Sequence, residues 1–130
     1  IRARVRAGMP YMGWSAGANF AGPTLRTTND MPVVDPRGFG ALNLVPFQIN
    51  PHYTERTLSG HGGESRDDRI AEFLVMNPAV PVLGIREGSL VKVEGPRATL
   101  LLGPGARLFR HRQRARDLKA GADVSALLRK

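Results

Sequence analysis

Cysteine is absent from this 130-residue sequence, and no window of about 18 uncharged apolar residues occurs in it. The first absence excludes disulfides, thiolate zinc sites and a cysteine nucleophile, and it fits a reducing, cytoplasmic compartment. The second excludes a transmembrane helix, so we expect no membrane partner. No cluster of residues has the spacing of metal ligands, and we therefore expect neither a metal nor another cofactor.

Acidic residues are few, with 11 Asp and Glu against 19 Lys and Arg, which gives a net charge of +8. Hydrophobic residues make up 42% of the chain, which is enough for the core of one domain and excludes a disordered tail. The chain opens at Ile1 without an initiator methionine or the apolar core of a signal peptide. Its most reactive-looking motif, the glycine-rich turn Gly13–Gly17, begins only a few residues later, so we expect this sequence to be the later part of a longer chain.

The positive charge is concentrated near the carboxyl end. Five arginines and Lys119 lie between positions 107 and 119, and Asp117 is the only acidic residue among them. Such a run can bind nucleic acid, but no aromatic platform or groove-reading motif accompanies it, so a solvated edge is the preferred interpretation. Beyond it, apolar residues favour either an additional helix or a homodimer contact built from Val124, Leu127 and Leu128.

Short apolar runs alternate with polar loops, and this alternation predicts an α/β domain. Strands are expected over residues 9–14, 42–49 and 80–85, helices over 15–21 and 66–76, and a hairpin over 90–94 and 98–102. The two segments between these elements, residues 24–40 and 54–65, are polar and glycine-rich and are expected to be loops.

The chemistry is concentrated in Gly13-Trp14-Ser15-Ala16-Gly17, which matches the G-x-S-x-G pattern of a nucleophile elbow between a strand and a helix. The sharp turn strains the serine backbone, and glycines two residues before and after it avoid crowding. The serine Oγ is then exposed, and the Ala16 N–H is placed as an oxyanion donor. The alternative is an ordinary serine in a glycine-rich turn.

A serine nucleophile needs a general base, and the base needs an orienting acid. Of the three histidines, His52 follows a predicted strand, whereas His61 lies in a glycine-rich loop and His111 in the basic run. Position alone favours His52 over His61 and leaves His111 remote. Glu87 follows another predicted strand and is the candidate acid, although a glutamate in a loop is more often simply solvated.

Five linked motifs agree with one known family in order and spacing: Gly13–Asn19, Arg26–Pro32, Gln48–His52, Gly63–Ile70 and Gly84–Gly88. They resemble the peptidase E family of α-aspartyl dipeptidases. The resemblance runs from the start to about Leu102, and residues 103–130 depart from it as a divergent basic tail. Residues 1–130 would then form the C-terminal portion of a single catalytic domain.

The resemblance implies an α/β fold similar to class I glutamine amidotransferases, a sheet flanked by helices, with serine in place of their cysteine. It implies a serine peptidase that hydrolyses dipeptides with an N-terminal aspartate through an acyl-enzyme. Family roles place the nucleophile at Ser15, the general base at His52 and the acid at Glu87. Asp30 falls on a family position that is important for activity. The resemblance therefore favours His52 over His61.

Members of the family also have a sizeable N-terminal part, which supplies a second oxyanion donor and the first strands of the sheet. This sequence has no counterpart of it, and a sheet without those strands would leave an edge and an apolar face uncovered. We therefore expect the chain to be the C-terminal piece of a split or nicked enzyme, held against its N-terminal piece.

An N-terminal aspartate presents a carboxylate and an ammonium near the scissile bond. The planar fork of arginine suits the carboxylate, with Arg66 the first candidate and Arg26 the second. The ammonium needs an acid, for which Asp30 and Glu64 are candidates, although Glu64 could instead cap a helix. Trp14 is expected to pack in the core rather than to line this pocket.

Two further hypotheses remain open from the sequence. One is a related serine hydrolase acting on other aspartyl substrates, such as a cyanophycinase-like enzyme or an isoaspartyl peptidase, although Arg26–Pro32 favours the dipeptidase. The other is an inactive binding fragment whose basic tail contacts acidic partners.

Overall fold

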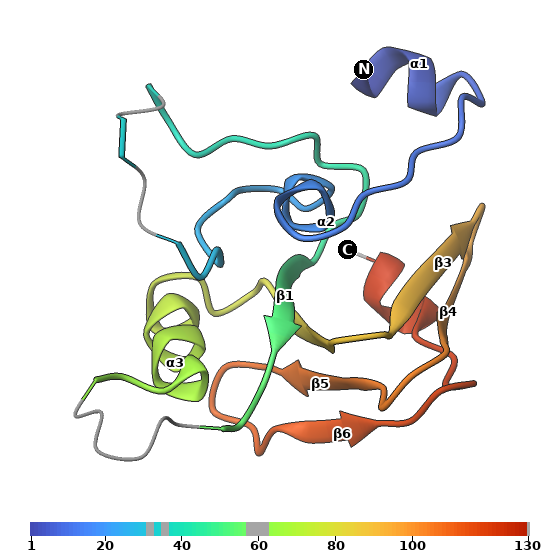
Figure 1. Cartoon of the computed structure of the whole chain (residues 1–130). Coiled ribbons are helices and arrows are strands. Elements are labelled where there is room, and N and C mark those ends of the chain that lie inside the picture. Colours follow the sequence, from blue (N-terminus) through green and yellow to red (C-terminus); the bar gives the residue numbers. More distant parts are fainter. Residues whose placement is uncertain (31–32, 35–36, 57–62, 130) are drawn as a thin grey trace.

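The computed structural model describes residues 1–30, 33–34, 37–56 and 63–129 (Figure 1). Both helices and strands form along these residues, in agreement with the predicted α/β class. Their order is α1 (Arg2–Arg6), α2 (Ala16–Phe20), β1 (Gln48–Tyr53), α3 (Arg66–Met76), β2 (Val82–Arg86), β3 (Leu90–Glu94), β4 (Arg97–Leu101), β5 (Ala106–Phe109), β6 (Arg116–Leu118) and the 3-10 helix η1 (Ser125–Leu128). Among them, no helix is long and apolar enough to cross a membrane.

The main sheet has the strand order β1-β2-β5-β6. Strands β1 and β2 are parallel, in a register that pairs Gln48 with Val82 and Asn50 with Gly84, whereas β5 and β6 are antiparallel to their neighbours. Strands β3 and β4 form a separate hairpin beside the sheet, as the sequence predicts (Figure 1). Because β1 and β2 are parallel, the residues that follow them lie at the same edge of the sheet.

Each face of the sheet packs against a different apolar cluster, because successive side chains of a strand point to opposite faces. On one face, Ile70 and Leu74 of α3 contact Val82, Tyr53 and Phe109. On the other, α2, the hairpin and η1 cover a cluster built from Val45, Phe47, Ile49, Leu83, Ala98, Leu100, Ala106, Val124 and Leu127. The sheet is therefore buried on both sides.

Helix α3 has the predicted bounds and begins with a capping box. The Ser65 side chain accepts a hydrogen bond from the Asp68 N–H, and the Asp68 carboxylate accepts one from the Ser65 N–H at 3.1 Å. These bonds hold the pKa of Asp68 below its ordinary value. The alternative cap role considered for Glu64 is wrong, because Ser65 is the cap.

Strand β1 begins later than the predicted range of 42–49 and extends to Tyr53. The preceding segment is instead tied to the end of α2, since the N–H groups of Leu42, Asn43 and Leu44 donate to carbonyls of residues 20–22. Asn43 has a φ of 49°, which bends the chain there. Helix C-terminal carbonyls need such donors, and this requirement outweighs the strand pattern.

The predicted strand over residues 9–14 does not form. Side chains already occupy the free edge of β1: the Ile49 carbonyl accepts hydrogen bonds from Asn19 at 2.6 Å and Thr27 at 2.8 Å. A strand needs a backbone partner, and none lies beside residues 9–14 in the part of the chain described here. Trp14 is 78% exposed, so its expected place in the core is also wrong.

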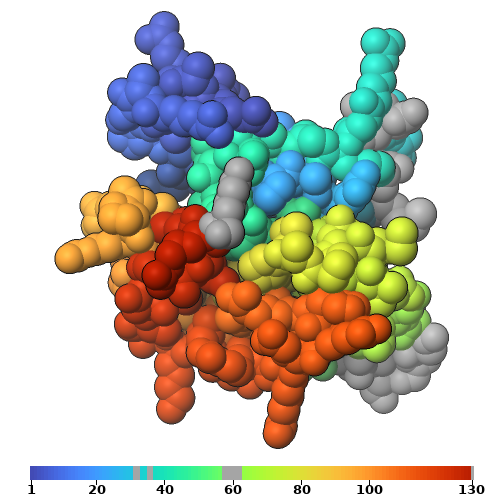
Figure 2. Space-filling model, turned by 180° about the vertical axis from the view of Figure 1, so that it is seen from behind, coloured from blue at the N-terminus to red at the C-terminus, as the bar shows by residue number. Residues whose placement is uncertain are grey.

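The basic carboxyl-terminal segment is built into the domain. Strands β5 and β6 extend the main sheet, and Val124 and Leu127 are buried in its core. The additional helix considered from the sequence is the 3-10 helix η1. Of the three residues predicted for a dimer contact, Val124 and Leu127 are buried and Leu128 is partly buried against the same core. Figure 2 shows this segment packed into the body of the molecule, with long side chains projecting from one edge.

Candidate active site

Ser15 is the N-cap of α2 and has a φ of 51° and a ψ of −125°. A serine rarely adopts this left-handed φ, so the strained turn expected from the G-x-S-x-G motif is present. A Cβ added to Gly13 would lie 2.5 Å from the Gly17 carbonyl oxygen, and only glycine allows that approach. The turn is braced by the Tyr11 hydroxyl, which donates to the same Gly17 carbonyl at 2.6 Å.

Ala16 and Gly17, the other two parts of the motif, are not crowded as Gly13 is. Ala16 is exposed and is the first residue of α2, where an N–H has no acceptor within the helix, so its position suits an oxyanion donor. A Cβ added to Gly17 would meet nothing within 4 Å. The expectation that both glycines avoid crowding is therefore correct for Gly13 and wrong for Gly17.

His52 and Glu87 meet at the edge of the sheet where β1 and β2 end. His52 Nδ1 contacts the Glu87 carboxylate oxygen Oε2. The His52 side chain is 47% exposed and that of Glu87 is 81% exposed. No hydrogen bond joins Ser15 to either residue within the described ranges, so the structure pairs the candidate base and acid and places the serine on a neighbouring element, α2.

The pairing of His52 and Glu87 follows from the backbone. His52 has a φ of 52°, within a register irregularity of β1 between Asn50 and Tyr53, and such a bulge re-aims a side chain. Glu87 lies in the tight turn after β2, which is closed by a 3.0 Å hydrogen bond from the Ser89 N–H to the Arg86 carbonyl. The ends of the parallel strands β1 and β2 therefore place His52 and Glu87 in contact.

The remaining histidines are placed differently. His111 lies in the connection from β5 to β6, and β5 ends beside the beginning of β2 because Phe109 pairs with Val82. It is therefore at the opposite edge of the sheet from His52. His61 lies outside the described residues.

Arg66 and Arg26, the two candidates for binding a substrate carboxylate, line the same pocket of about 410 Å³. The pocket lies between α3 and residues 26–29, and Arg69 and Asn29 also line it. Arg66 donates to the Pro51 carbonyl at 3.3 Å, which places its guanidinium one residue from His52. Arg69 donates to the Asn29 carbonyl at 3.1 Å. Three arginines and one acidic residue, Glu72, line the pocket, and this excess of positive charge favours an anionic ligand.

The candidates for binding an ammonium are not brought into this pocket. Asp30 and Glu64 are both exposed, and neither lines it. Arg69 was not among the predicted site residues, although its spacing indicates it: Arg66 and Arg69 are three residues apart on a predicted helix and so share one face. Within the described ranges, no three acidic or histidine side chains gather as they would around a metal ion.

The fold and the strained serine together define a mixed α/β domain with a nucleophile-elbow turn. The sequence matches the family described as Peptidase family S51 over residues 1–101. The chain therefore belongs to peptidase family S51.

Its relatives include three proteins that are each named Peptidase E. That of Streptomyces coelicolor is 58% identical over 125 residues, which are 95% of this chain and 51% of that protein. Those of Shewanella amazonensis and Shewanella denitrificans are 50% and 48% identical over 128 residues, each covering 98% of this chain and 54% of the relative. The chain spans about half the length of the curated relatives it matches.

Proposed function

We propose that this protein is a serine dipeptidase that hydrolyses dipeptides with an N-terminal aspartate, with Ser15, His52 and Glu87 as its catalytic triad. The observation that carries the proposal is the contact of His52 Nδ1 with the Glu87 carboxylate, between residues 35 positions apart in the sequence. This contact fixes one ring nitrogen of the base, as a triad acid does, and leaves Nε2 for the serine. Membership of family S51 supports the same assignment.

The proposed reaction is acyl transfer. His52 removes the Ser15 proton as Oγ attacks the peptide carbonyl, and it then protonates the leaving amine as the C–N bond breaks. Glu87 accepts the Nδ1 proton in a hydrogen bond and stabilises the imidazolium. The Ala16 N–H donates to the oxyanion, and losing one such donor typically costs about 10²- to 10³-fold in rate. Water then attacks the acyl-enzyme and releases aspartate.

Specificity for aspartate is assigned to the arginine-lined pocket. The three arginines that line it, Arg26, Arg66 and Arg69, suit the side-chain carboxylate of the substrate. Arg66 is the principal candidate because its guanidinium reaches the backbone beside His52. Asp30 and Glu64 remain the proposed partners of the substrate ammonium, which requires that they approach the pocket when substrate binds.

Further parts of the proposal concern the complete sheet, the N-terminal portion and the assembly of the protein. We infer a sheet of the class I glutamine amidotransferase type, completed by an N-terminal portion that supplies the second oxyanion donor. The exposed Met12 and Trp14 beside the elbow fit such a neighbour. A homodimer and a cytoplasmic location belong to the same proposal, and a sequence without cysteine fits that compartment.

Other aspartyl substrates form the second candidate, because a pocket lined by three arginines would accept the carboxylate of an isoaspartyl or cyanophycin-like substrate as well. Values of kcat/KM for a panel of α-aspartyl, isoaspartyl and polymeric aspartyl substrates distinguish this candidate from the α-aspartyl dipeptidase. An inactive binding fragment would be recognised by the absence of any reaction of Ser15 with a fluorophosphonate probe.

The deciding experiment is aspartyl-dipeptide hydrolysis by the full-length protein and its Ser15→Ala variant, with intact mass measured on the same samples. We expect activity and fluorophosphonate labelling to disappear together in the variant. His52→Asn should also be inactive, and His111→Asn, its matched control at the other edge of the sheet, should keep full activity. Hydrolysis that survives in Ser15→Ala would refute the proposed mechanism.

A further inference from the structure

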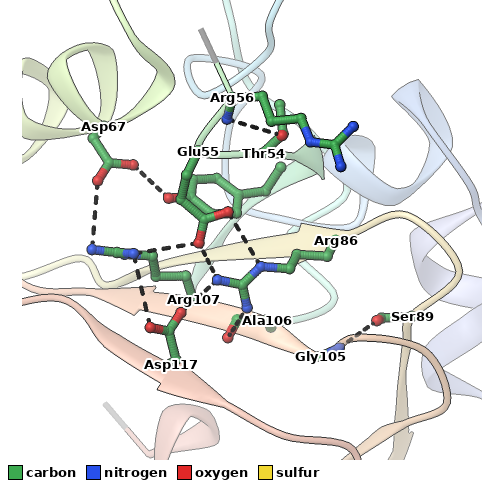
Figure 3. Close-up of polar contacts among 11 residues, drawn as sticks. Thr54, Glu55, Arg56, Asp67, Arg86, Ser89, Gly105, Ala106, Arg107 and Asp117 are labelled. Carbon is green, nitrogen blue, oxygen red and sulfur yellow. Dashed lines mark hydrogen bonds and ion pairs between the residues drawn. The ribbon is translucent and has the colours of Figure 1, made fainter.

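A cluster of charged side chains surrounds Arg86, the residue before Glu87 (Figure 3). The Arg86 guanidinium binds the Glu55 carboxylate and the Asp117 carboxylate, the latter at 2.5 Å, and donates to the Ala106 carbonyl at 3.2 Å. Its side chain is 17% exposed, so most of it is shielded from water. One planar group thus joins the end of β2 to β5, to β6 and to the segment after β1.

Arg107 extends this cluster to α3. It lies 3.3 Å from the Glu55 carboxylate, 3.7 Å from that of Asp67 and 3.8 Å from that of Asp117 (Figure 3). The Tyr53 hydroxyl donates to Asp67 at 2.5 Å. The hydrogen bond from Arg86 lowers the pKa of Glu55, whereas burial and the neighbouring Asp67 raise the pKa of Tyr53.

Both members of the His52–Glu87 pair are directly attached to the cluster through the backbone. Glu87 follows Arg86, and His52 precedes Tyr53, whose ring lies 5.6 Å below the Arg86 guanidinium. A Cβ added to Gly84 of β2 would lie 2.6 Å from the Tyr53 ring, so the two strands are in close contact here. The cluster therefore fixes the ends of both strands against each other.

The His52 and Glu87 side chains have little else to hold them. The His52 side chain is about half exposed and that of Glu87 is mostly exposed, and among the described residues the only side-chain partner of Glu87 is His52. An exposed ion pair contributes little stability by itself, because water screens it and two side chains lose freedom. The geometry of the pair must therefore come from the backbone beneath it.

We propose that Arg86 is a positioning residue for catalysis, which holds Glu87 where its carboxylate meets His52 Nδ1. This inference rests on the proposed function. Lysine cannot replace Arg86 in this role, because one ammonium cannot reproduce a planar fork that binds two carboxylates and a carbonyl together. The carboxyl-terminal segment takes part in the site through Asp117, although it lies far from the reacting atoms in the sequence.

The test is a double-mutant cycle in the full-length protein, read as the second-order rate of fluorophosphonate labelling at Ser15, per folded molecule. We expect Arg86→Lys to lower this rate by about 10-fold to 10²-fold, the usual cost of a small misplacement. In a Glu87→Gln background, Arg86→Lys should cost less than about twofold, because independent changes add and coupled ones do not. For dipeptide hydrolysis, the loss should fall on kcat and leave KM unchanged.

Arg110→Lys is the matched control, since Arg110 has no ion pair among the described residues, and it should leave the labelling rate unchanged. Asp117→Asn removes one partner of Arg86 and should show a smaller loss with the same dependence on Glu87. If Arg86→Lys does not fold, the result for Asp117→Asn tests the positioning role of Arg86 in its place. Equal losses in both backgrounds, or none in either, would overturn the positioning role. Absence of labelling in the unsubstituted protein would instead overturn the proposed function, and this inference with it.

Discussion

The serine and the His52–Glu87 pair are held by different kinds of contact. Ser15 is fixed by neighbours within a few residues, through the Gly13–Gly17 approach and the Tyr11 hydroxyl. His52 and Glu87 are fixed by two strands, whose ends are joined by a cluster of charges that draws on four further segments. The nucleophile's geometry is thus local, whereas that of the base and acid depends on distant parts of the chain. Substitutions should act differently in the two regions.

The largest effect is expected at the contact between His52 and Glu87. Glu87→Gln removes the charge that orients and stabilises the His52 imidazolium, and it should lower kcat by about 10²- to 10⁴-fold with a small change in KM. Glu94→Gln, an exposed glutamate at the end of β3, is the control and should behave like the unsubstituted protein. A loss below threefold would mean that the contact with His52 does not serve catalysis.

In the Gly13–Gly17 turn, a single added methyl group should change the reactivity of Ser15. Gly13→Ala places a Cβ against the Gly17 carbonyl and displaces the Ser15 backbone, so labelling of Ser15 should fall by about 10²-fold. Gly17→Ala is the matched variant in open space, and alanine should stabilise α2 by up to about 1 kcal/mol. Thermal melting and labelling of both variants test this asymmetry. Similar losses in the two variants would show that Gly17 is crowded as well.

The arginine pocket should affect substrate binding rather than Ser15 reactivity. Arg66→Ala removes the guanidinium nearest to His52, and kcat/KM for an aspartyl dipeptide should fall by about 10-fold to 10²-fold, mainly through KM. Fluorophosphonate labelling, which needs no aspartate, should be unchanged. If labelling falls as strongly as hydrolysis, Arg66 supports the site and does not recognise the substrate.

The smallest effect is expected at the cap of α3. The pKa of Asp68 is lowered in the folded protein, so its contribution to stability is present above the unfolded-state pKa and is lost as pH falls through the folded-state pKa. Asp68→Asn should therefore lower the melting temperature slightly at pH 7. At pH values below the folded-state pKa, the two proteins should melt together. A difference that persists there would assign the effect to something other than the carboxylate charge.

Local patterns in the sequence predicted much of this structure. The helix predicted over residues 66–76 forms as α3 at those bounds, and the hairpin predicted over residues 90–94 and 98–102 forms as β3 and β4. The backbone hydrogen bonds within each element join residues close in the sequence, so a local pattern contains both partners. The strand expected at residues 9–14 failed because a strand requires a partner, which a local pattern does not contain.

The sequence by itself determined the strained serine turn and, through its linked motifs, the family, because these depend on residue types at short spacing. The candidate triad of Ser15, His52 and Glu87 came from the family resemblance, since position alone left the base and the acid open. The tertiary structure decided that His52 Nδ1 meets Glu87, that Arg69 joins Arg26 and Arg66, and that Asp117 of the carboxyl-terminal strand β6 binds Arg86, the residue before Glu87. Those contacts join residues tens of positions apart. Strand pairing and the partly buried ion cluster create them, and neither can be read from neighbouring residues alone.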